Sequence, residues 1–474
     1  MLDVLELEQL NDGEAIICSN ISINNLCFDS RLCKENDAFF CFVGGESDGH
    51  KYIDQAIKNG AGIIVSENSN INKVDGISYI FTTNSRLLYA KASYHYFKDQ
   101  IKDLKIIGIT GTDGKSSTAY YTYQLLKSFN YKCAMFSTVY TDDGTGLKLS
   151  EYSQSTPDAF YMFTFLAESA KNKVDFFIQE ATSHALSEKI ERLYGIEYIS
   201  SAYTAVSSEH LEFHKTIDNY YKTKARLQDK TKGSTFVYEN NKILPYLKNN
   251  NLTILPELEF NKQSLKESTF TYNGCEYSFN LGYKFALENA FLAASITSYV
   301  LKINICDVLL KINELNHAKG RMQEYKYNGA TIIIDFAHTA NSFYCLFSQL
   351  KKMYPGKNII SVFSSSGQRD KEKRYHMAKV ADKYSSTIIL SEDDPRNESF
   401  SSICDDLLKG IENPDKVIII EDRKEAIKKA LEKANEDTII CLLGKGHQMS
   451  MYKGSASVYY SEEETLLKLI ECNG

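Results

Sequence analysis

A phosphate-binding loop is the clearest chemical signal in the chain. Residues 108–117 read Gly-Ile-Thr-Gly-Thr-Asp-Gly-Lys-Ser-Ser and lie between a predicted strand and a predicted helix. Backbone N–H groups of such a turn, the helix N-terminus and Lys115 form a cradle for nucleotide phosphates, and the Ser116 hydroxyl can ligate Mg²⁺. Ile109 stands at the first glycine of the strict pattern, so the match is to a variant. An ordinary glycine-rich turn is the alternative, which the coincidence of strand, Gly-Lys-Ser and helix disfavours.

Two more polar clusters follow predicted strands. Glu180 ends one strand and is followed by Ser183, at the edge where open α/β sheets bind ligands, so its carboxylate could hold Mg²⁺. The cluster 209–214 follows the next strand, and Lys224 stands fourteen residues after His210. Each group alone is typical of a surface position. Together with the phosphate loop they indicate one nucleotide site.

Alternating strands and helices must position these groups. Short β-rich runs at 105–110, 133–137 and 175–180 alternate with helical stretches at 116–129 and 157–171, which predicts βαβ units and a parallel sheet. Residues 234–281 predict a small antiparallel sheet, and another helical stretch follows near 285–301. Five further strands, at 331–336, 358–363, 387–390, 416–420 and 438–443, predict a second open α/β sheet.

Length and composition limit the class of protein. The chain has 474 residues, and one core stops growing at about 250 to 300, so we expect two or three domains. The net charge of −7 gives no global positive field for a nucleic-acid backbone. The start is acidic, unlike a secretory signal, and no stretch approaches the roughly 20 apolar residues of a membrane span. The 11 cysteines form no Cys-x-x-Cys pair. We expect a cytoplasmic protein without membrane insertion or nucleic-acid binding.

Ordered motifs along nearly the whole chain resemble the ATP-dependent Mur ligases of peptidoglycan synthesis, most closely the branch that adds the third, diamino, residue. Besides the phosphate loop, the resemblance rests on motifs at 29–31, 48–50, 59–61, 155–158, 180–186, 209–214, 320–322, 335–339, 368–374, 393–396 and 444–447. It implies a three-domain α/β fold. Residues 1–103 would bind a UDP-sugar, 104–318 would form a P-loop parallel-sheet ATPase domain, and 319–474 would form a Rossmann-like domain that binds the amino acid.

The resemblance also implies a reaction. ATP would phosphorylate the terminal carboxylate of UDP-N-acetylmuramoyl-L-Ala-D-Glu, and a diamino acid would displace phosphate from the acyl phosphate to form an amide. The cofactors would be ATP, Mg²⁺ and a CO₂-derived carbamate on Lys224, which turns that cation into an anion able to face metal. The partners would be the UDP-muramoyl dipeptide and the diamino acid, and we expect a monomer.

The family pattern assigns site residues to this sequence. It implies catalytic roles for Lys115, His210 and Lys224, and metal binding by Ser116, Glu180, His210 and Lys224. The ATP set is Gly111, Thr112, Gly114, Lys115, Ser116, Ser117, Asn289, Arg321 and Asp335, with Arg321 acting across a cleft. The UDP-sugar peptide set is Ser30, Thr156, Ser183 and Arg192. The amino-acid set is Arg369, Asp393, Asp394, Arg396, Gly444 and Gln448.

Several positions depart from the family pattern. Asp113 replaces the usual Asn beside the phosphates, so its charge has to face away or toward metal, and Ala340-Asn341 replaces Pro-Asp. Arg396 suits a distal carboxylate, as in diaminopimelate, whereas Asp394, in place of Asn, suits a distal ammonium. Gln448 stands where diaminopimelate-adding members carry Glu. The open alternatives are a specialised amide ligase with another acceptor or amine, a folylpolyglutamate-type ligase, and a nucleotide-binding scaffold without turnover.

Overall fold

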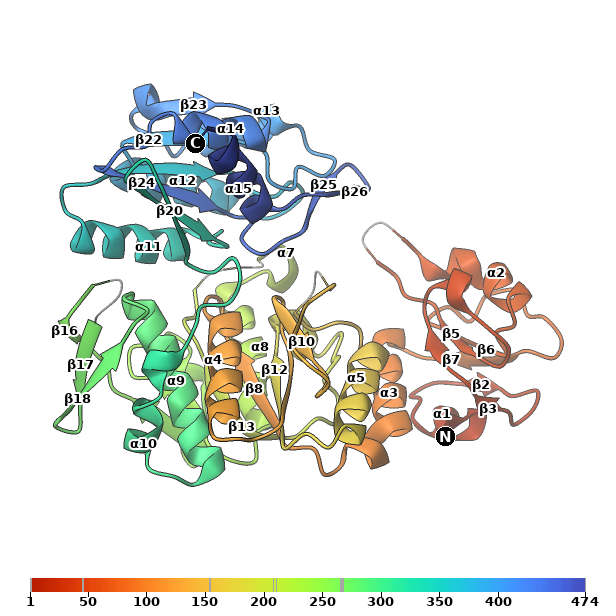
Figure 1. The fold of residues 1–474 in the computed structure, drawn as a ribbon. Coiled ribbons are helices and arrows are strands. Elements are labelled where there is room, and N and C mark those ends of the chain that lie inside the picture. The colour runs from red at the N-terminus through yellow and green to blue at the C-terminus, as the bar shows by residue number, and fades with distance from the viewer. Residues whose placement is uncertain are drawn as a thin grey trace.

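The chain contains three sheet-centred domains in sequence order. The computed structural model describes residues 2–44, 47–152, 155–207, 209, 211–264 and 268–473. Within these residues the largest sheets have five, eight and six strands. Figure 1 shows the N-terminal domain beside the central one and the C-terminal domain above it. The predicted three-domain α/β architecture is confirmed, while the borders at 103/104 and 318/319 stay predictions.

The N-terminal domain is a small mixed sheet. Its strand order is β2-β7-β6-β5-β4, with β4 to β7 parallel and β2 antiparallel to β7. The long helix α3 (Ser85–Ile101) begins at Asn84, whose side chain accepts from the N–H of Leu87, and packs against α5 of the central domain. The other elements are β1 (Leu2–Asp3), α1 (Val4–Gln9), β2 (Ala15–Ile16), β3 (Ser22–Ile23), β4 (Leu26–Cys27), β5 (Ala38–Phe40), α2 (Ile53–Lys58), β6 (Ile63–Ser66) and β7 (Ser78–Phe81).

The central domain is built on the sheet β11-β10-β9-β12-β8-β13-β14-β15. The six strands from β9 through β12, β8, β13 and β14 to β15 are parallel. At the other edge, β10 pairs antiparallel with both β9 and β11. The strands are β8 (Ile106–Thr110), β9 (Cys133–Phe136), β10 (Tyr140–Asp142), β11 (Lys148–Leu149), β12 (Phe176–Glu180), β13 (Tyr198–Tyr203), β14 (Thr235–Tyr238) and β15 (Leu252–Leu255). The helices are α4 (Lys115–Ser128), α5 (Ala159–Lys171), α6 (Ser183–Leu186), α7 (Leu211–His214), α8 (Ile217–Asp229), α9 (Lys284–Leu301) and α10 (Ile305–Leu309).

Helices cover both faces of this sheet, and successive residues of a strand contact opposite covers because their side chains alternate between the faces. Ile107 and Ile109 of β8 belong to the buried cluster that includes side chains of α4 and α9. Ile106 belongs to the cluster on the other face, with side chains of α3, α5 and α8. Helix α9 holds the most apolar stretch seen in the sequence, which is buried against α4. Among the described residues, no helix is long and apolar enough to cross a membrane.

The stretch 234–281 is divided between two sheets. Strands β16 (Phe260–Lys262), β17 (Ser268–Tyr272) and β18 (Cys275–Phe279) form the expected antiparallel excursion. The earlier strands β14 and β15 instead extend the parallel sheet. The prediction was wrong there, because a short apolar run such as that of β14 fits a buried parallel strand and an antiparallel strand equally well.

The C-terminal domain has the strand order β19-β20-β24-β21-β22-β23, parallel except for β19. Its β21, β22 and β24 have the predicted bounds. Helices α11 and α12 share a buried cluster with one face, and α14 and α15 with the other. The elements are β19 (Gln323–Tyr327), β20 (Ala330–Asp335), α11 (Ala340–Met353), β21 (Asn358–Phe363), α12 (Glu372–Tyr384), β22 (Thr387–Leu390), α13 (Phe400–Leu408), β23 (Val417–Ile419), α14 (Arg423–Leu431), β24 (Thr438–Leu443), β25 (Ser450–Lys453), β26 (Ala456–Tyr459) and α15 (Glu462–Asn473).

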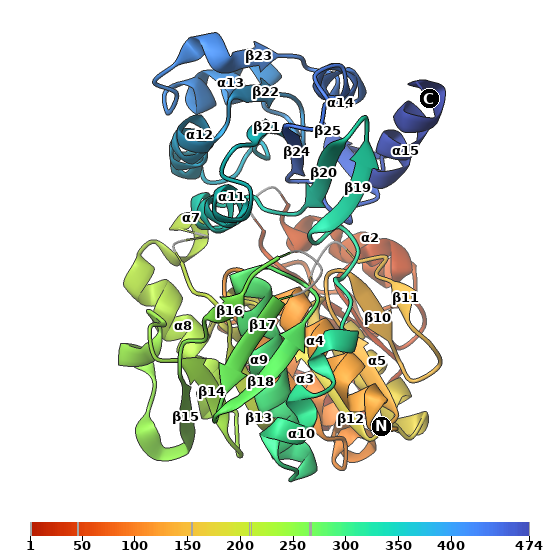
Figure 2. The ribbon, with the colours of Figure 1, turned by 60° about the vertical axis from the view of Figure 1, so that its left-hand side comes forward.

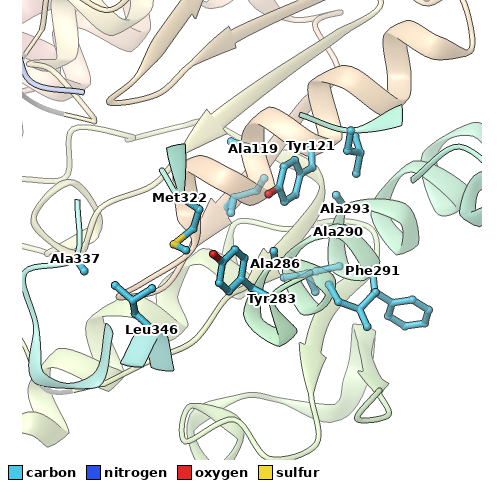
Figure 3. Close-up of a cluster of buried hydrophobic side chains, with 14 of the residues drawn as sticks. Ala119, Tyr121, Tyr283, Ala286, Ala290, Phe291, Ala293, Met322, Ala337 and Leu346 are labelled. Carbon is cyan, nitrogen blue, oxygen red and sulfur yellow. The ribbon is translucent and has the colours of Figure 1, made fainter. Parts of the chain in front are cut away.

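An apolar cluster joins the central and C-terminal domains. Figure 3 shows Tyr121 of α4 and Ala286 of α9 with Met322, Ala337 and Leu346 from the C-terminal domain. Figures 1 and 2 both show α11 on the side of the C-terminal domain that faces the central domain. The carboxyl ends of β8 and β12 therefore lie near this border, where parallel sheets bind ligands.

Candidate active site

The phosphate loop, residues 108–117, connects the end of β8 to the first turn of α4. Its glycines are needed for the backbone path, because Gly111 has φ of +149° and Gly114 has φ of +90°. A Cβ at Gly114 would lie 2.6 Å from Oδ1 of Asn289, and one at Gly111 would lie 1.9 Å from Oγ1 of Thr204. Any larger residue would therefore displace the loop from β13 or α9.

A cavity of about 520 Å³ opens over this loop, a size typical of small-molecule sites. Its lining comes from the central and C-terminal domains. Of the nine residues expected to bind ATP, the lining includes Thr112, Gly114, Lys115, Ser116, Ser117, Asn289, Arg321 and Asp335, and Gly111 of the loop is outside it. The structure thus places residues more than 200 positions apart around one cavity, and their roles in ATP binding stay predictions.

Two of the residues predicted to bind metal, Ser116 and Glu180, lie in the cavity wall. Glu180 is buried, and its carboxylate accepts hydrogen bonds from the N–H (3.2 Å) and the hydroxyl (3.3 Å) of Thr138. The side chains of Glu180 and Ser116 line the same cavity, and hydroxyl and carboxylate oxygens suit Mg²⁺. Among the described residues, no group of three or more His, Cys, Asp or Glu could hold a metal. A cation here would need further oxygens, such as those of phosphates.

Two cations reach the loop from different domains. Nζ of Lys115 donates to the carbonyl of Thr112 (2.7 Å). Nη2 of Arg321 lies 3.4 Å from Oγ of Ser116, its guanidinium stacks on Phe336 (4.5 Å), and its Nε has no hydrogen-bond partner. Burial lowers the pKa of Arg321. A half-buried guanidinium with an unsatisfied donor beside an open cavity is suited to an anion.

Lys224 lies behind the loop rather than in the cavity lining. Its ammonium is buried, donates to the carbonyl of Gly111 (2.6 Å) and lies over the ring of Tyr220 (4.7 Å). Burial, with the neighbouring charge of Lys115, lowers its pKa well below the ordinary value. An unmodified ammonium in this place supports the loop and cannot ligate a cation.

Glu209, in the cluster at 209–214, contacts the C-terminal domain. His210, predicted to act in catalysis and metal binding, lies outside the described residues. The neighbouring Glu209 carboxylate contacts Nε2 of His338 (3.2 Å) across the domain border, and both residues line the cavity.

Sequence reasoning missed the contact of Thr138 with Glu180. The position of Thr138 just after the carboxyl end of β9 was a usable signal for it.

A second cavity, of about 320 Å³, lies between the N-terminal and central domains. Phe28 and Phe42 stack at 5.1 Å, and the guanidinium of Arg86 lies 4.5 Å from the ring of Phe42. Arg192 also lines the cavity, and its Nη1 donates to the carbonyl of Thr156 (2.7 Å). Aromatic faces with two guanidinium groups suit a nucleotide base and its phosphates.

The other residues predicted for the UDP-sugar peptide do not line this cavity. Thr156 is buried beside β12, where its hydroxyl donates to the carbonyl of Glu180 (2.8 Å). Oγ of Ser183 contacts Nε2 of His214 (3.0 Å), and Oγ of Ser30 donates to Gln55 (3.3 Å). All three side chains are thus hydrogen-bonded within the protein in this structure, and their roles in substrate binding stay predictions.

The predicted amino-acid residues lie at the carboxyl edge of the C-terminal sheet, after β21, β22 and β24. A Cβ at Gly444 would lie 2.9 Å from Oδ2 of Asp393, Arg396 lies over Tyr452 (5.9 Å), and the N–H of Gln448 donates to the carbonyl of Lys445 (3.0 Å). Arg369 lies in the segment between β21 and α12. These residues are outside the lining of both cavities.

Asp394 is already engaged within the protein. Its Oδ1 accepts from the buried ammonium of Lys445 (2.9 Å) and from the N–H of Tyr452 (3.0 Å). Lys445 also lies 3.4 Å from Asp393. Lys445 and the N–H of Tyr452 thus already contact one oxygen of Asp394, and the binding of a substrate's distal ammonium by Asp394 stays a prediction.

Comparison with known proteins decides the family. The Mur ligase family catalytic domain matches residues 22–102, the Mur ligase middle domain 109–296, and the Mur ligase glutamate ligase domain 320–446. The chain is 34% identical to a UDP-N-acetylmuramyl-tripeptide synthetase of Borreliella burgdorferi over 95% of this chain and 93% of that one. This chain belongs to the Mur ligase family. Members of the family are ATP-dependent, ADP-forming amide ligases.

Other relatives agree with this Mur ligase assignment. UDP-N-acetylmuramoyl-L-alanyl-D-glutamate–2,6-diaminopimelate ligase 1 of Clostridium acetobutylicum is 30% identical over 96% of this chain and 97% of its own. A solved structure of a UDP-N-acetylmuramoyl-L-alanyl-D-glutamate–2,6-diaminopimelate ligase has a TM-score of 0.59, with 23% identity over 95% of both chains. MurF ligase of Thermotoga maritima, solved with ADP, has a TM-score of 0.60 and 17% identity, over 94% of this chain and 97% of that one. These structural likenesses concern the fold.

Replacing Lys115 tests the ATP cavity. Lys115→Met should weaken ATP binding by roughly tenfold or more, because a charge-assisted hydrogen bond contributes about 1.5–3 kcal/mol. Lys127→Met is the matched control, since Lys127 is an exposed lysine in the last turn of the same helix. Calorimetric titration of each variant with ATP and MgCl₂ measures the effect. Equal affinities of the two variants would show that ATP binds elsewhere.

Proposed function

We propose that this Mur ligase joins a diamino acid to the D-glutamate carboxylate of UDP-N-acetylmuramoyl-L-alanyl-D-glutamate, with conversion of ATP to ADP and phosphate. The observation that carries the proposal is the convergence of Lys115, Ser116, Glu180 and Arg321 on one cavity over the phosphate loop. The names of the relatives supply the acceptor, since they are tripeptide synthetases and diaminopimelate ligases with nearly the same length.

The reaction proceeds in two steps. A carboxylate oxygen of the acceptor attacks the γ-phosphorus of ATP, the bond to the β-phosphate oxygen breaks, and ADP leaves. The neutral amine then attacks the acyl carbon, phosphate leaves with the former carboxylate oxygen, and the amine loses a proton. Lys115 and Arg321 place positive charge at the anionic groups that must meet. The apolar contacts between the central and C-terminal domains help to exclude water, which would hydrolyse the acyl phosphate.

The residues fit the magnesium that such a reaction needs. Ser116 and Glu180 supply hard oxygen ligands at the cavity wall, and the phosphates of ATP would supply others. Mg²⁺ bound there would offset the negative charge of the phosphate groups. Thr138 orients Glu180 for this role through two hydrogen bonds to its carboxylate.

Lys224 fits a carbamate as part of the same proposal. The lowered pKa of Lys224 increases the fraction of the side chain that is a neutral amine, which is the form that reacts with CO₂. The phosphate loop, whose Gly111 carbonyl Lys224 contacts, separates this side chain from the cavity. The carbamate would replace a buried cation beside Lys115 with an anion, which suits a site that already holds Lys115 and Arg321. His210 would complete the metal site, as the family pattern predicts.

The UDP portion of the acceptor fits the cavity between the N-terminal and central domains. Phe28 and Phe42 offer aromatic faces for the base, and Arg86 and Arg192 offer guanidinium groups for the diphosphate. We propose that Arg396 and Arg369 bind a carboxylate of the incoming amino acid.

We also propose that the enzyme is a cytoplasmic monomer.

A second candidate is a specialised amide ligase with a different amine. Asp394 and Gln448 favour it, because both depart from the diaminopimelate pattern and Asp394 is paired with Lys445. One reaction that contains diaminopimelate, lysine and ornithine together, read by product mass, identifies the amine that the site prefers.

The proposed function predicts that ADP release depends on both acceptors. ADP should form at a substantial rate only when the UDP-muramoyl dipeptide and a diamino acid are both present, because the acyl phosphate accumulates without the amine. A coupled ADP assay and the product mass measure this. ADP release with neither acceptor, or turnover with a folate in place of the UDP-sugar, would contradict the proposal.

Removing the Lys224 side chain tests the carbamate. Lys224→Ala should lower turnover by roughly 10- to 100-fold while ATP still binds, and added short carboxylic acids should restore part of the rate. Lys222→Ala, an exposed lysine of the same helix paired with Asp218, is the matched control and should turn over normally. Normal turnover of Lys224→Ala would remove the carbamate from the mechanism.

A further inference from the structure

Asp113 is an acidic residue inside a loop built to hold phosphates. A carboxylate beside bound phosphates is electrostatically unfavourable, so its orientation matters. In this structure its carboxylate turns to the C-terminal domain, where Oδ2 accepts hydrogen bonds from the hydroxyl of Thr339 (3.4 Å) and from Nδ2 of Asn341 (3.3 Å). Asp113 thus joins the phosphate loop to a segment more than 220 residues later in the chain.

Both donors stand at the N-terminus of the 14-residue helix α11. Thr339 is the N-cap: its Oγ1 accepts from the N–H of Ser342 (3.0 Å) and forms a capping box with that residue. Asn341 lies in the first turn. The N-terminus of a helix carries partial positive charge, so a carboxylate is stabilised there. The geometry gives Asp113 two neutral donors and a favourable helix end.

Two departures from the family pattern meet at this contact. Asp113 stands where Asn is usual, and Asn341 stands where Asp is usual. The structure places the two side chains within hydrogen-bonding distance. The contact therefore pairs one carboxylate with one amide.

We infer that Asp113 and Asn341 are positioning residues that couple the phosphate loop to the docked C-terminal domain. The same docking brings Arg321 to Ser116 and His338 to Glu209. The inference rests on the proposed function for its catalytic consequence, since a loop that loses this contact would hold ATP away from Arg321. Neither residue needs to touch the reacting atoms.

An exchange of the two side chains tests the coupling. Asn341→Asp places two carboxylates against each other and should lower kcat by about tenfold or more, and the double variant Asp113→Asn/Asn341→Asp should return to within about threefold of the natural enzyme. Asp113→Asn keeps an acceptor for both donors, and Asn341→Ala removes one donor but leaves that of Thr339, so each should lose less than about fivefold. An acidic residue in the first turn favours a helix, so Asn341→Asp should keep its melting temperature.

A second measurement needs no turnover. Small-angle scattering of the full chain without ligands should show a larger radius of gyration for Asn341→Asp and the natural value for the double variant. If the natural enzyme shows no ADP release with the muramoyl dipeptide and any diamino acid, the proposed function fails, while scattering still tests the contact. Loss of activity in Asp113→Asn without rescue in the double variant would mark Asp113 as a metal or ATP ligand and overturn the inference. So would an Asn341→Asp variant that matches the natural enzyme in both measurements.

Discussion

Anionic phosphates held against a buried loop must be met by positive charge from more than one part of the chain. The loop supplies backbone N–H groups and Lys115, but the second cation, Arg321, lies beyond the central domain and reaches Ser116 only through the docked C-terminal domain. The apolar cluster of Tyr121, Met322 and Leu346, the Glu209–His338 pair and the Asp113–Asn341 contact all serve this docking. The arrangement of domains is therefore part of the site and not only its scaffold.

The features that could be predicted from sequence are the local ones. The phosphate loop is contiguous, and its conformation follows from glycines with positive φ at Gly111 and Gly114. Strands β21, β22 and β24 are short β-branched or aliphatic runs separated by helices, so their bounds were predicted without error. The three-domain α/β architecture followed from the alternation of predicted strands and helices and from the order of the motifs that carry the family resemblance.

The features that could not be predicted depend on contacts between distant segments. The aromatic pair Phe28 and Phe42 lies on strand ends that look ordinary in sequence, and its cavity forms only where two domains meet. The pairing of Lys445 with Asp394 joins residues 51 positions apart and changes what Asp394 is free to bind. Strands β14 and β15 were misplaced because sheet membership is a property of neighbours, which a short apolar run does not specify.

The step on which the proposed function depends is the activation of the acceptor carboxylate by ATP as an acyl phosphate. Its most direct test is a single reaction with the D-glutamate carboxylate of the acceptor labelled with ¹⁸O, followed by mass analysis of the products. The account predicts that each amide formed transfers one ¹⁸O atom to inorganic phosphate. Unlabelled phosphate, with the displaced ¹⁸O atom found in water or in the nucleotide instead, would contradict it.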